Sequence, residues 1–314
     1  MTSKKQTYRI RNWKEYNKAL VQRGSLTIWF DQESIESWHA SQPTGKRGRP
    51  QLYSDLAIQC CLTLKAVFHL PLRGTQGFVE SLLSLMKLPL KAPDYSLLSI
   101  RQKTLRLQLP EKTKTNKEGE AMHLVVDSTG LKLYGEGEWK VKKHGKDKRR
   151  TWLKLHLGVN ADNHDIEACV LTGNHVHDCK ILPKLLDQVE GKLNQVSGDG
   201  AYDTHDAYAI SIEYGAKPCF PPRKSAIRHQ ASDEAWRERN HAVSHVIYHG
   251  LRDWKKRHHY HRRSLAETAM FRFKQLMGAS VQAQTFDRQS REIGIKCLVV
   301  NKMTKLGMPV TVVT

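Results

Sequence analysis

The sequence lacks the features that would direct a protein to a membrane or out of the cell. It has no run of about 18 apolar residues, so no membrane span is expected. The N-terminus, Met1-Thr-Ser-Lys-Lys, is polar and has no apolar signal core, so secretion is not expected. The six cysteines form no C-x-x-C pair and no disulfide-like spacing, which predicts reduced thiols in a cytoplasmic protein. Without a cysteine pair, the sixteen histidines do not predict a zinc site.

Acidic side chains are few relative to basic ones. The 314 residues include 51 Lys and Arg against 31 Asp and Glu, a formal net charge of +20. Such an excess favours a polyanionic partner, first of all nucleic acid, although charge alone says nothing about the fold. The hydrophobic content of 39% and the seven tryptophans argue against a disordered chain. The length allows one large domain or two ordinary ones.

The N-terminal part of the chain is predicted to be helical. Residues 1–50 are polar and end in Gly45-Lys-Arg-Gly-Arg-Pro50, which is typical of a DNA-contacting arm or a linker. Apolar residues at helical spacing and flanking prolines then predict helices over residues 54–70, 72–88 and about 94–107. Three short helices ending in a basic one resemble a helix-turn-helix DNA-binding module, a pattern that other small helical bundles share. The expected DNA contacts on the third helix are Arg101, Lys103 and Arg106.

A charged segment poor in apolar residues, 110–120, is the expected domain boundary, so we predict a helical DNA-binding region over 1–115 and a catalytic domain over 116–314. Beyond it the pattern predicts strands, a hairpin and helices in alternation. The expected strands cover 122–127, 152–159, 165–171, 195–199 and 217–222, and the expected helices cover 178–189 and 204–214. This order predicts an α/β fold with a mixed sheet flanked by helices.

Two aspartates follow apolar strands in this second region. Asp127 ends the strand 122–127, and Asp199 ends the strand 195–199. Carboxylates at strand ends gather at one edge of a sheet. Asp203 is an alternative to Asp199, but it is expected to begin the next helix instead of ending a strand.

A third carboxylate, Glu267, belongs to a segment with helical periodicity. At about 100° per residue, Tyr260, Arg263 and Lys274 share a face with Glu267. The opposite, apolar side is predicted to consist of Leu265, Ala269, Phe273 and Leu276. Taken alone, this pattern is explained better by an ordinary surface helix with Arg–Glu pairing. Three clustered carboxylates, however, repel one another and favour hard divalent cations, and a pair of such ions supports displacement at phosphorus.

At this point the motifs resemble those of the insertion-sequence DDE transposases. Tyr260, Arg263, Glu267 and Lys274 match that family's signature without a gap. Asp127-Ser-Thr-Gly-Leu-Lys and Asp199-Gly-Ala-Tyr-Asp match the surroundings of its first two catalytic aspartates. Phe220-Pro-Pro-Arg-Lys224 and Asn301-Lys-Met-Thr-Lys305 also look like this group. Over almost the full chain, the sequence is most similar to the insertion sequence five family, nearest its nine-oh-three branch.

The resemblance implies a ribonuclease-H-like catalytic domain that depends on two Mg²⁺ ions, with Mn²⁺ able to substitute. By position, Asp127, Asp199 and Glu267 are the implied catalytic residues and metal ligands. Tyr260, Arg263 and Lys274 are expected to contact DNA near the cleaved phosphate. The implied partner is double-stranded DNA, at the element's inverted repeats and at the target, bound by a homo-oligomer at the nucleoid. The implied chemistry is cleavage that frees a 3′-OH and attack of that 3′-OH on target DNA.

Two basic stretches fit the same interpretation, although a solvated loop is the alternative for each. The first lies between residues 140 and 154, and its expected DNA contacts are Lys140, Lys142, Lys143, Arg149 and Arg150. The second covers 252–263, where Trp254 and Tyr260 stand among six Lys and Arg. Phosphate contacts position DNA, and aromatic side chains stack on unpaired bases. Two other functions compete: a metal-dependent nuclease or resolvase without strand transfer, and a non-catalytic DNA-binding regulator.

Overall fold

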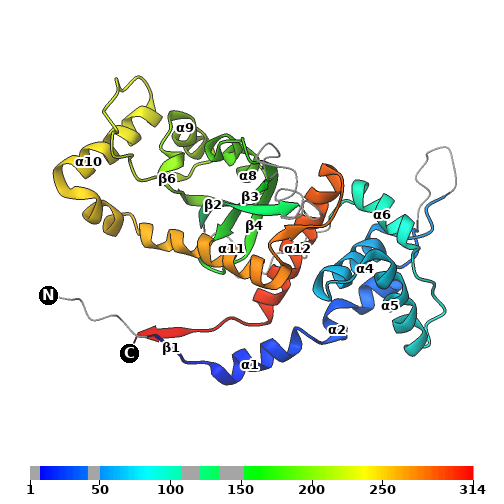
Figure 1. Ribbon diagram of the computed structural model, residues 1–314. Helices are drawn as coiled ribbons and strands as arrows, with labels where there is room; N and C mark the ends of the chain where they lie inside the picture. Colours follow the sequence, from blue (N-terminus) through cyan, green and yellow to red (C-terminus); the bar gives the residue numbers. More distant parts are fainter. Residues whose placement is uncertain (1–7, 42–49, 108–120, 134–151, 314) are drawn as a thin grey trace, which may run out of the picture. The chain divides into compact units, whose positions relative to one another are not determined.

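The computed structural model describes residues 8–41, 50–107, 121–133 and 152–313, and it forms two compact units (Figure 1). The first unit contains residues 1–109 and 298–314, and the second contains residues 110–297. The C-terminal segment, which we expected in the catalytic domain, groups with the first unit. It does so because its last strand pairs with the first strand of the chain, Tyr8 opposite Val313. The expected boundary near residue 115 lies outside the described residues.

The three predicted helices of the first unit are confirmed, although the third ends at Thr104, before Arg106, and side-chain caps begin the first and the third. The Ser54 hydroxyl accepts a hydrogen bond from the Ala57 N–H at 3.0 Å, and Asp94 accepts one from the Ser96 N–H at 2.7 Å. Among the described residues no single helix is long and apolar enough to span a membrane; one pair, α4 and α5, passes that test together but is bent by 111°. The elements are β1 Tyr8–Ile10, α1 Trp13–Gln22, α2 Leu26–Trp29, α3 Gln32–Glu36, α4 Asp55–Val67, α5 Leu72–Leu85, α6 Tyr95–Thr104 and β8 Thr311–Val313.

Residues 13–38, for which the sequence predicted no individual helix, are largely helical. Three helices occupy this stretch. Helix α2 ends at Trp29 and Trp38 follows α3, and these two side chains are only 2% and 1% exposed. The Trp38 indole N–H also donates to the Lys91 carbonyl at 2.9 Å, so its polar atom is satisfied inside the core. These helices were not predicted because their apolar residues are few and irregularly spaced. Two large buried aromatic side chains pack this region in place of a longer apolar stripe. Residues 42–49, which hold most of the basic stretch, lie outside the described part.

The second unit is built on the predicted mixed sheet. Its strand order is β4-β3-β2-β5-β6, and β7 pairs with the far end of β2. The strands β2, β3 and β4 are antiparallel neighbours, whereas β5, β6 and β7 join in parallel. The strands are β2 Met122–Leu133, β3 Trp152–Asn160, β4 Ile166–Gly173, β5 Leu193–Ser197, β6 Lys217–Cys219 and β7 Ser280–Val281.

Helices cover this sheet, and the alternation of side chains along β2 decides which residues face them. Leu124 and Val126 belong to the apolar core that α8 and α9 complete. Because successive side chains point to opposite faces, Val125 and Asp127 face the other side. Helix α11, Ser264–Met277, also packs against β2 and β3 (Figure 1). The helical elements are η1 Asp178–Ile181, α8 Leu182–Leu186, η2 Gly200–Tyr202, α9 His205–Glu213, α10 Glu234–Arg257, η3 Tyr260–Arg263, α11 Ser264–Met277 and α12 Phe286–Leu306.

Candidate active site

The register of the sheet brings the two aspartates together. Val125 of β2 pairs with Ser197 of the parallel strand β5, and Asp127 and Asp199 each lie two residues beyond that pair. Asp127 does not end its strand, as we had expected: β2 continues to Leu133, and Asp127 pairs with Leu157 on its other side. It is β5 that ends at Ser197, so Asp127 lies where its parallel neighbour leaves the sheet.

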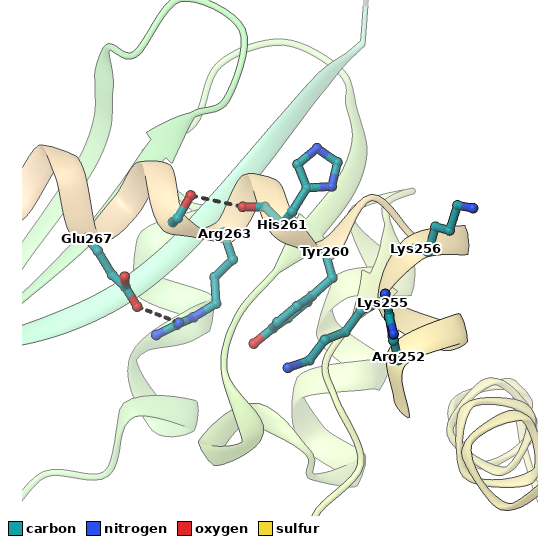
Figure 2. Close-up of a pocket in the computed structure, with 8 residues that line it drawn as sticks. Arg252, Lys255, Lys256, Tyr260, His261, Arg263 and Glu267 are labelled. Carbon is teal, nitrogen blue, oxygen red and sulfur yellow. Dashed lines mark hydrogen bonds and ion pairs between the residues drawn. The ribbon is translucent and has the colours of Figure 1, made fainter. Parts of the chain in front are cut away.

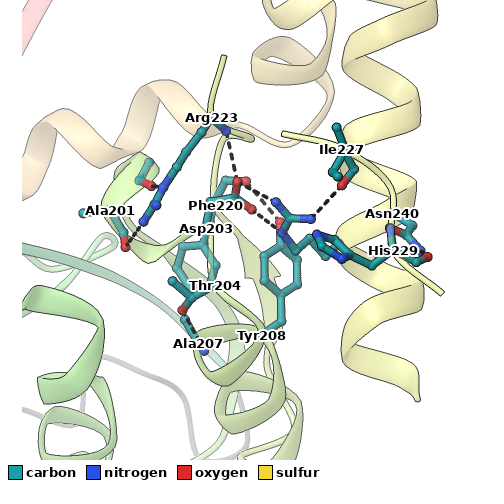
Figure 3. A network of polar contacts seen from close by, with 12 residues as sticks. Ala201, Asp203, Thr204, Ala207, Tyr208, Phe220, Arg223, Ile227, His229 and Asn240 are labelled. Carbon is teal, nitrogen blue, oxygen red and sulfur yellow. Dashed lines mark hydrogen bonds and ion pairs between the residues drawn. The ribbon is translucent and has the colours of Figure 1, made fainter. Parts of the chain in front are cut away.

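The chain turns sharply after β5, and this turn holds Asp199. The Asp199 carboxylate accepts a hydrogen bond from the Ala201 N–H at 2.9 Å and so caps η2. From the opposite side of the turn, the Arg223 guanidinium donates to the Gly200 carbonyl at 2.9 Å and to the Ala201 carbonyl at 3.2 Å (Figure 3). Arg223 thus fixes the backbone on which Asp199 is carried. It lies in the Phe220–Lys224 motif, which sequence reasoning noted without a role.

The alternative aspartate, Asp203, is used structurally. Its side chain is fully buried, and the Arg239 guanidinium of α10 binds both carboxylate oxygens, at 2.8 and 3.1 Å. The backbone N–H of Arg223 donates a third hydrogen bond to the Asp203 carboxylate at 3.0 Å (Figure 3). With its acceptors taken up inside the protein, Asp203 joins α9, α10 and the Arg223 segment to one another. Arg239 was missed from the sequence, because nothing in its local pattern separates it from the other charges of α10.

Gly198 precedes Asp199 at a place where the backbone passes a buried ring. A Cβ atom on Gly198 would lie 2.5 Å from Cδ2 of Tyr202, whose ring is buried and stacks on Phe220. We therefore expect Gly198→Ala to destabilise the protein by about 1–3 kcal/mol through overpacking, and to lower activity by displacing Asp199. Urea unfolding and a DNA cleavage assay measure the two effects.

Gly200→Ala is the matched control, because a Cβ there meets its nearest atom, the Pro221 carbonyl oxygen, at an ordinary 3.6 Å. Equal losses in the two variants would contradict the steric explanation.

The third carboxylate is carried by α11, and Arg263 connects it to the sheet. The Arg263 guanidinium donates to Glu267 Oε1 at 2.6 Å and to Asp127 Oδ2 at 3.1 Å. The Asp127 and Glu267 side chains are 16% and 56% exposed, so the pair lies at the border between core and solvent. A single planar guanidinium therefore spans two acids that are 140 residues apart in the chain.

The helix that carries Glu267 begins later than predicted. Tyr260–Arg263 form the 3-10 turn η3, and α11 starts at Ser264, so Tyr260 does not share one continuous α-helical face with Lys274. Of the predicted apolar stripe, Ala269 and Phe273 are buried, whereas Leu265 and Leu276 are only half-buried. The helix is rotated relative to our expectation because three further side chains take up the buried side. These are Ala266, Met270 and Met277.

Backbone contacts hold η3 beside the sheet. The Gln195 amide of β5 donates to the His258 carbonyl at 3.2 Å. Arg262, one of the cations in the second basic stretch, donates to the Ala161 carbonyl at 2.7 Å and pairs with Asp162. Arg262 therefore makes structural contacts within the second unit, whereas its neighbour Arg263 binds the carboxylates of Asp127 and Glu267.

Burial and like charge shape the electrostatics of the site. Burial raises the pKa of the Asp127 carboxyl, and the charges of Asp199 and Glu267 raise it further, against the lowering effects of the Ser128 N–H and Arg263. Burial alone would lower the pKa of Arg263, but Asp127 and its other anionic neighbours raise it above its usual value. Burial also raises the pKa of Tyr260 to about 12. The other two acids thus act on Asp127, and the Arg263 guanidinium is held charged beside it.

The donor set suits a hard divalent cation in its chemistry, because all three side chains offer carboxylate oxygens that repel one another. The Tyr202 hydroxyl is buried without a hydrogen-bond partner in the described part of the chain. Burial raises its pKa, and the charges of Asp178, Asp127 and Asp199 raise it further. As the side chains stand, no three His, Cys, Asp or Glu residues of the described ranges are grouped closely enough to hold a metal. The reason is visible at Arg263, whose guanidinium lies between Asp127 and Glu267.

The remaining predicted DNA contacts fall into three groups. Lys274 lies half-buried on α11 and makes no ion pair with a described residue, so it stays a prediction, as do the exposed Lys103 and Arg106. The predicted DNA contact at Arg101 is wrong, because this side chain is buried, pairs with Asp55 at 2.5 Å and donates to the Tyr53 carbonyl. Arg101 therefore stabilises the first unit. The contacts expected at Lys140, Lys142, Lys143, Arg149 and Arg150 lie outside the described residues.

The chain is similar to a solved structure described as a cryo-EM structure of the piggyBac transposase synaptic complex with hairpin DNA; the identity is 10%, the match covers 91% of this chain and 74% of that one, and the TM-score is 0.39. Two family models described as transposase DDE domain match, one over residues 21–136 and the other over residues 118–302. The second match spans more than half of the sequence and includes Asp127, Asp199 and Glu267, and the chain therefore belongs to the DDE-domain transposases.

Proposed function

We propose that this protein is the transposase of an insertion sequence, from the insertion sequence five family and its nine-oh-three branch. In this proposal it binds the terminal inverted repeats, cleaves the DNA at the element ends and joins the freed 3′-OH ends to target DNA. The ungapped spacing of Tyr260, Arg263, Glu267 and Lys274 supports the family, together with two aspartate motifs in the same order.

One observation carries the catalytic part of the proposal. Three acids from distant segments are connected: Asp127 and Asp199 each follow the paired residues Val125 and Ser197 by two positions, and Arg263 joins Asp127 to Glu267. A structural explanation accounts for one buried Arg–Asp pair, such as Arg239 with Asp203. It does not account for two further acids at a solvent-accessible border, where their repulsion serves no packing purpose.

DDE transposases generally use divalent metal ions, and we infer two Mg²⁺ ions here, with Mn²⁺ able to substitute. Asp127, Asp199 and Glu267 would hold them. When bound, such a pair stabilises the attacking and the leaving oxygens of an in-line displacement at phosphorus. The protein's contribution is the placement of the three acids, which the sheet register, the Arg223 contacts and α11 fix independently of one another.

The neighbouring side chains are suited to hold the phosphate that is cut. Tyr260 keeps its proton at neutral pH, because its pKa is about 12, and so it offers a hydroxyl donor. Arg263 offers a planar guanidinium that can move from carboxylate oxygens to phosphate oxygens, since both accept the same paired hydrogen bonds. Lys274 adds a point charge on α11.

We also propose a fold family for the catalytic unit and partners for the protein. The strand order β4-β3-β2-β5-β6, with an antiparallel meander continued by parallel strands, supports a ribonuclease-H-like catalytic unit. The partners are double-stranded element ends and target DNA. Synapsis of two ends requires at least a dimer, and the complex acts in the cytoplasm at the nucleoid. The α4–α6 helices remain the proposed end-recognition module, with Lys103 and Arg106 as its cations.

The proposal is tested by incubating the protein with Mg²⁺, an element-end duplex taken from the DNA that flanks the reading frame, and a supercoiled target. We expect cleaved ends and joined products, and neither product when EDTA is added. Cleavage without any joined product would favour a nuclease. Binding without cleavage, unchanged when Glu267 is replaced by Ala, would favour a regulator.

A further inference from the structure

We propose that Arg252, Lys255 and Lys256, with the Tyr260 ring, form a binding site for the sugar-phosphate backbone of the DNA strand that enters the carboxylate site. The inference rests on the proposed function and adds a place for the phosphates beside the one that is cut. It concerns a pocket of about 500 Å³ in the second unit (Figure 2). One end of its lining is formed by Arg263 and Glu267, and the other by the three cations.

The two walls of this pocket come from consecutive segments that fold back on each other. Gly250 interrupts α10 with φ 82° and ψ 157°, a conformation that favours glycine, and the helix restarts in a new direction. Arg252, Lys255 and Lys256 follow at i, i+3 and i+4, so they share one face of the restarted segment. The chain then reverses at His259, whose φ is 49°, and enters η3.

Aromatic packing fixes the two walls to each other. Trp254 is 1% exposed, and its ring lies 5.6 Å from that of Tyr260 and 4.9 Å from that of His258. Lys255 Nζ lies 5.4 Å from the centre of the Tyr260 ring, and the two side chains run side by side toward the end where Arg263 and Glu267 lie (Figure 2). The distance between the cations and the carboxylate site is therefore set by the fold.

These three cations differ from the neighbouring ones in having no anionic partner in the described ranges. Arg257, in the same helical turn, pairs with Asp253 at 2.9 Å, and Arg262 pairs with Asp162. Arg252, Lys255 and Lys256 are exposed and make no ion pair with a described residue. Of the described residues that line the pocket, Glu267 is the one acid, and it already binds Arg263. The pocket thus presents uncompensated positive charge beside a site for phosphodiester chemistry.

A backbone of regularly spaced phosphates is the ligand that this arrangement fits. Lysine ammonium groups bind phosphate as point charges without reading sequence, and an aromatic ring tolerates any sugar or base that lies on it. The competing explanation is that cations in the last turn of a helix interact with its dipole, and it requires no ligand. The two explanations differ in what happens to DNA binding when the charges are removed.

The first test compares Lys255→Gln/Lys256→Gln with Lys184→Gln/Lys192→Gln. The control removes the same charge from exposed lysines of the same unit, on α8 and before β5. Binding of the element-end duplex is measured in EDTA over a range of salt concentrations, so that no cleavage intervenes. We expect the plot of log K against log salt to become shallower by about 0.9 for each lost phosphate contact, with about tenfold weaker binding at low salt. The control should keep the wild-type slope. An unchanged slope in Lys255→Gln/Lys256→Gln, or equal changes in both variants, would overturn the proposal.

The second test locates the phosphates. Uncharged methylphosphonate groups are placed one at a time along the strand on either side of the cleavage position. Substitutions at the phosphates in the pocket should weaken binding of the wild type but not of Lys255→Gln/Lys256→Gln. Substitutions elsewhere should weaken both equally, and the same equal response at every position would exclude the pocket. Both tests measure binding alone. A wild-type protein that binds in this way but neither cuts nor joins DNA would therefore refute the proposed function without contradicting the proposed phosphate-binding pocket.

Discussion

Replacing Asp127, Asp199 or Glu267 by the amide of the same shape should reduce DNA cleavage on the order of a thousandfold or more, about 4 kcal/mol of transition-state stabilisation. The reason is electrostatic, because Asn and Gln keep the side-chain volume but lose the negative charge that a hard cation requires. DNA binding should be kept or slightly strengthened, since each change removes an acid from a basic protein. Single-turnover cleavage and DNA binding, measured on the same preparations, separate the two effects.

Asp206→Asn is the matched control for these variants. This aspartate lies seven residues after Asp199, and its side chain is 97% exposed. The same loss of charge at this position should leave cleavage within about twofold of the wild-type rate, in keeping with the small effects of surface changes. Wild-type cleavage by Glu267→Gln would refute the assignment of the third acid. A loss of cleavage as large in Asp206→Asn would show that the result reflects net charge instead of the site.

Arg239→Ala should have the largest effect on stability, with a loss of about 3–5 kcal/mol in the free energy of unfolding. The change leaves the fully buried Asp203 carboxylate with the Arg223 N–H as its remaining hydrogen bond among the contacts described above. A buried charge without its partner costs far more than a lost surface pair. Chemical unfolding monitored by tryptophan fluorescence gives the free energy directly.

Arg237→Ala tests whether the effect belongs to the ion pair. Arg237 lies two residues away on α10, is exposed, and makes no ion pair with a described residue. It should change the free energy of unfolding by no more than about 0.5 kcal/mol. The double change Arg239→Gln/Asp203→Asn should recover part of the lost stability, because both charges then leave the core together. Equal effects of Arg239→Ala and Arg237→Ala would show that the pair adds no stability.

The sequence predicts most of the elements that carry the candidate site, for identifiable reasons. Val125 and Val196 belong to short apolar runs that indicate strands, so the placement of Asp127 and Asp199 two and three residues after them on neighbouring segments of the sheet could be foreseen. The continuation of β2 beyond Asp127 could not, because Lys132 and Gly130 make that part look unlike a buried strand. The start of α11 at Ser264 was also missed, since a 3-10 turn and an α-helix place polar residues similarly over four positions.

The sequence pattern could not predict contacts between residues that are distant in the chain. Arg101 reads from its neighbours as a basic helix residue, yet tertiary structure buries it against Asp55. Arg239 looks like one more surface charge, yet it binds a buried aspartate 36 residues earlier. A guanidinium with a buried partner and one that faces solvent have the same local sequence signature, because pairing depends on which segments the fold brings together.

The pairing of Val125 with Ser197 limits how this protein can change in length. The loops that join the strands from β2 to β5 can gain or lose residues without disturbing Asp127 and Asp199, because both aspartates are positioned by the strand pairing and not by the length of chain that joins them. A single-residue deletion inside β2, between Val125 and Asp127, would instead turn the acid toward the apolar core under α8 and α9. Length variation among descendants of this gene is therefore expected in the connections, with the two ladder segments kept to the residue.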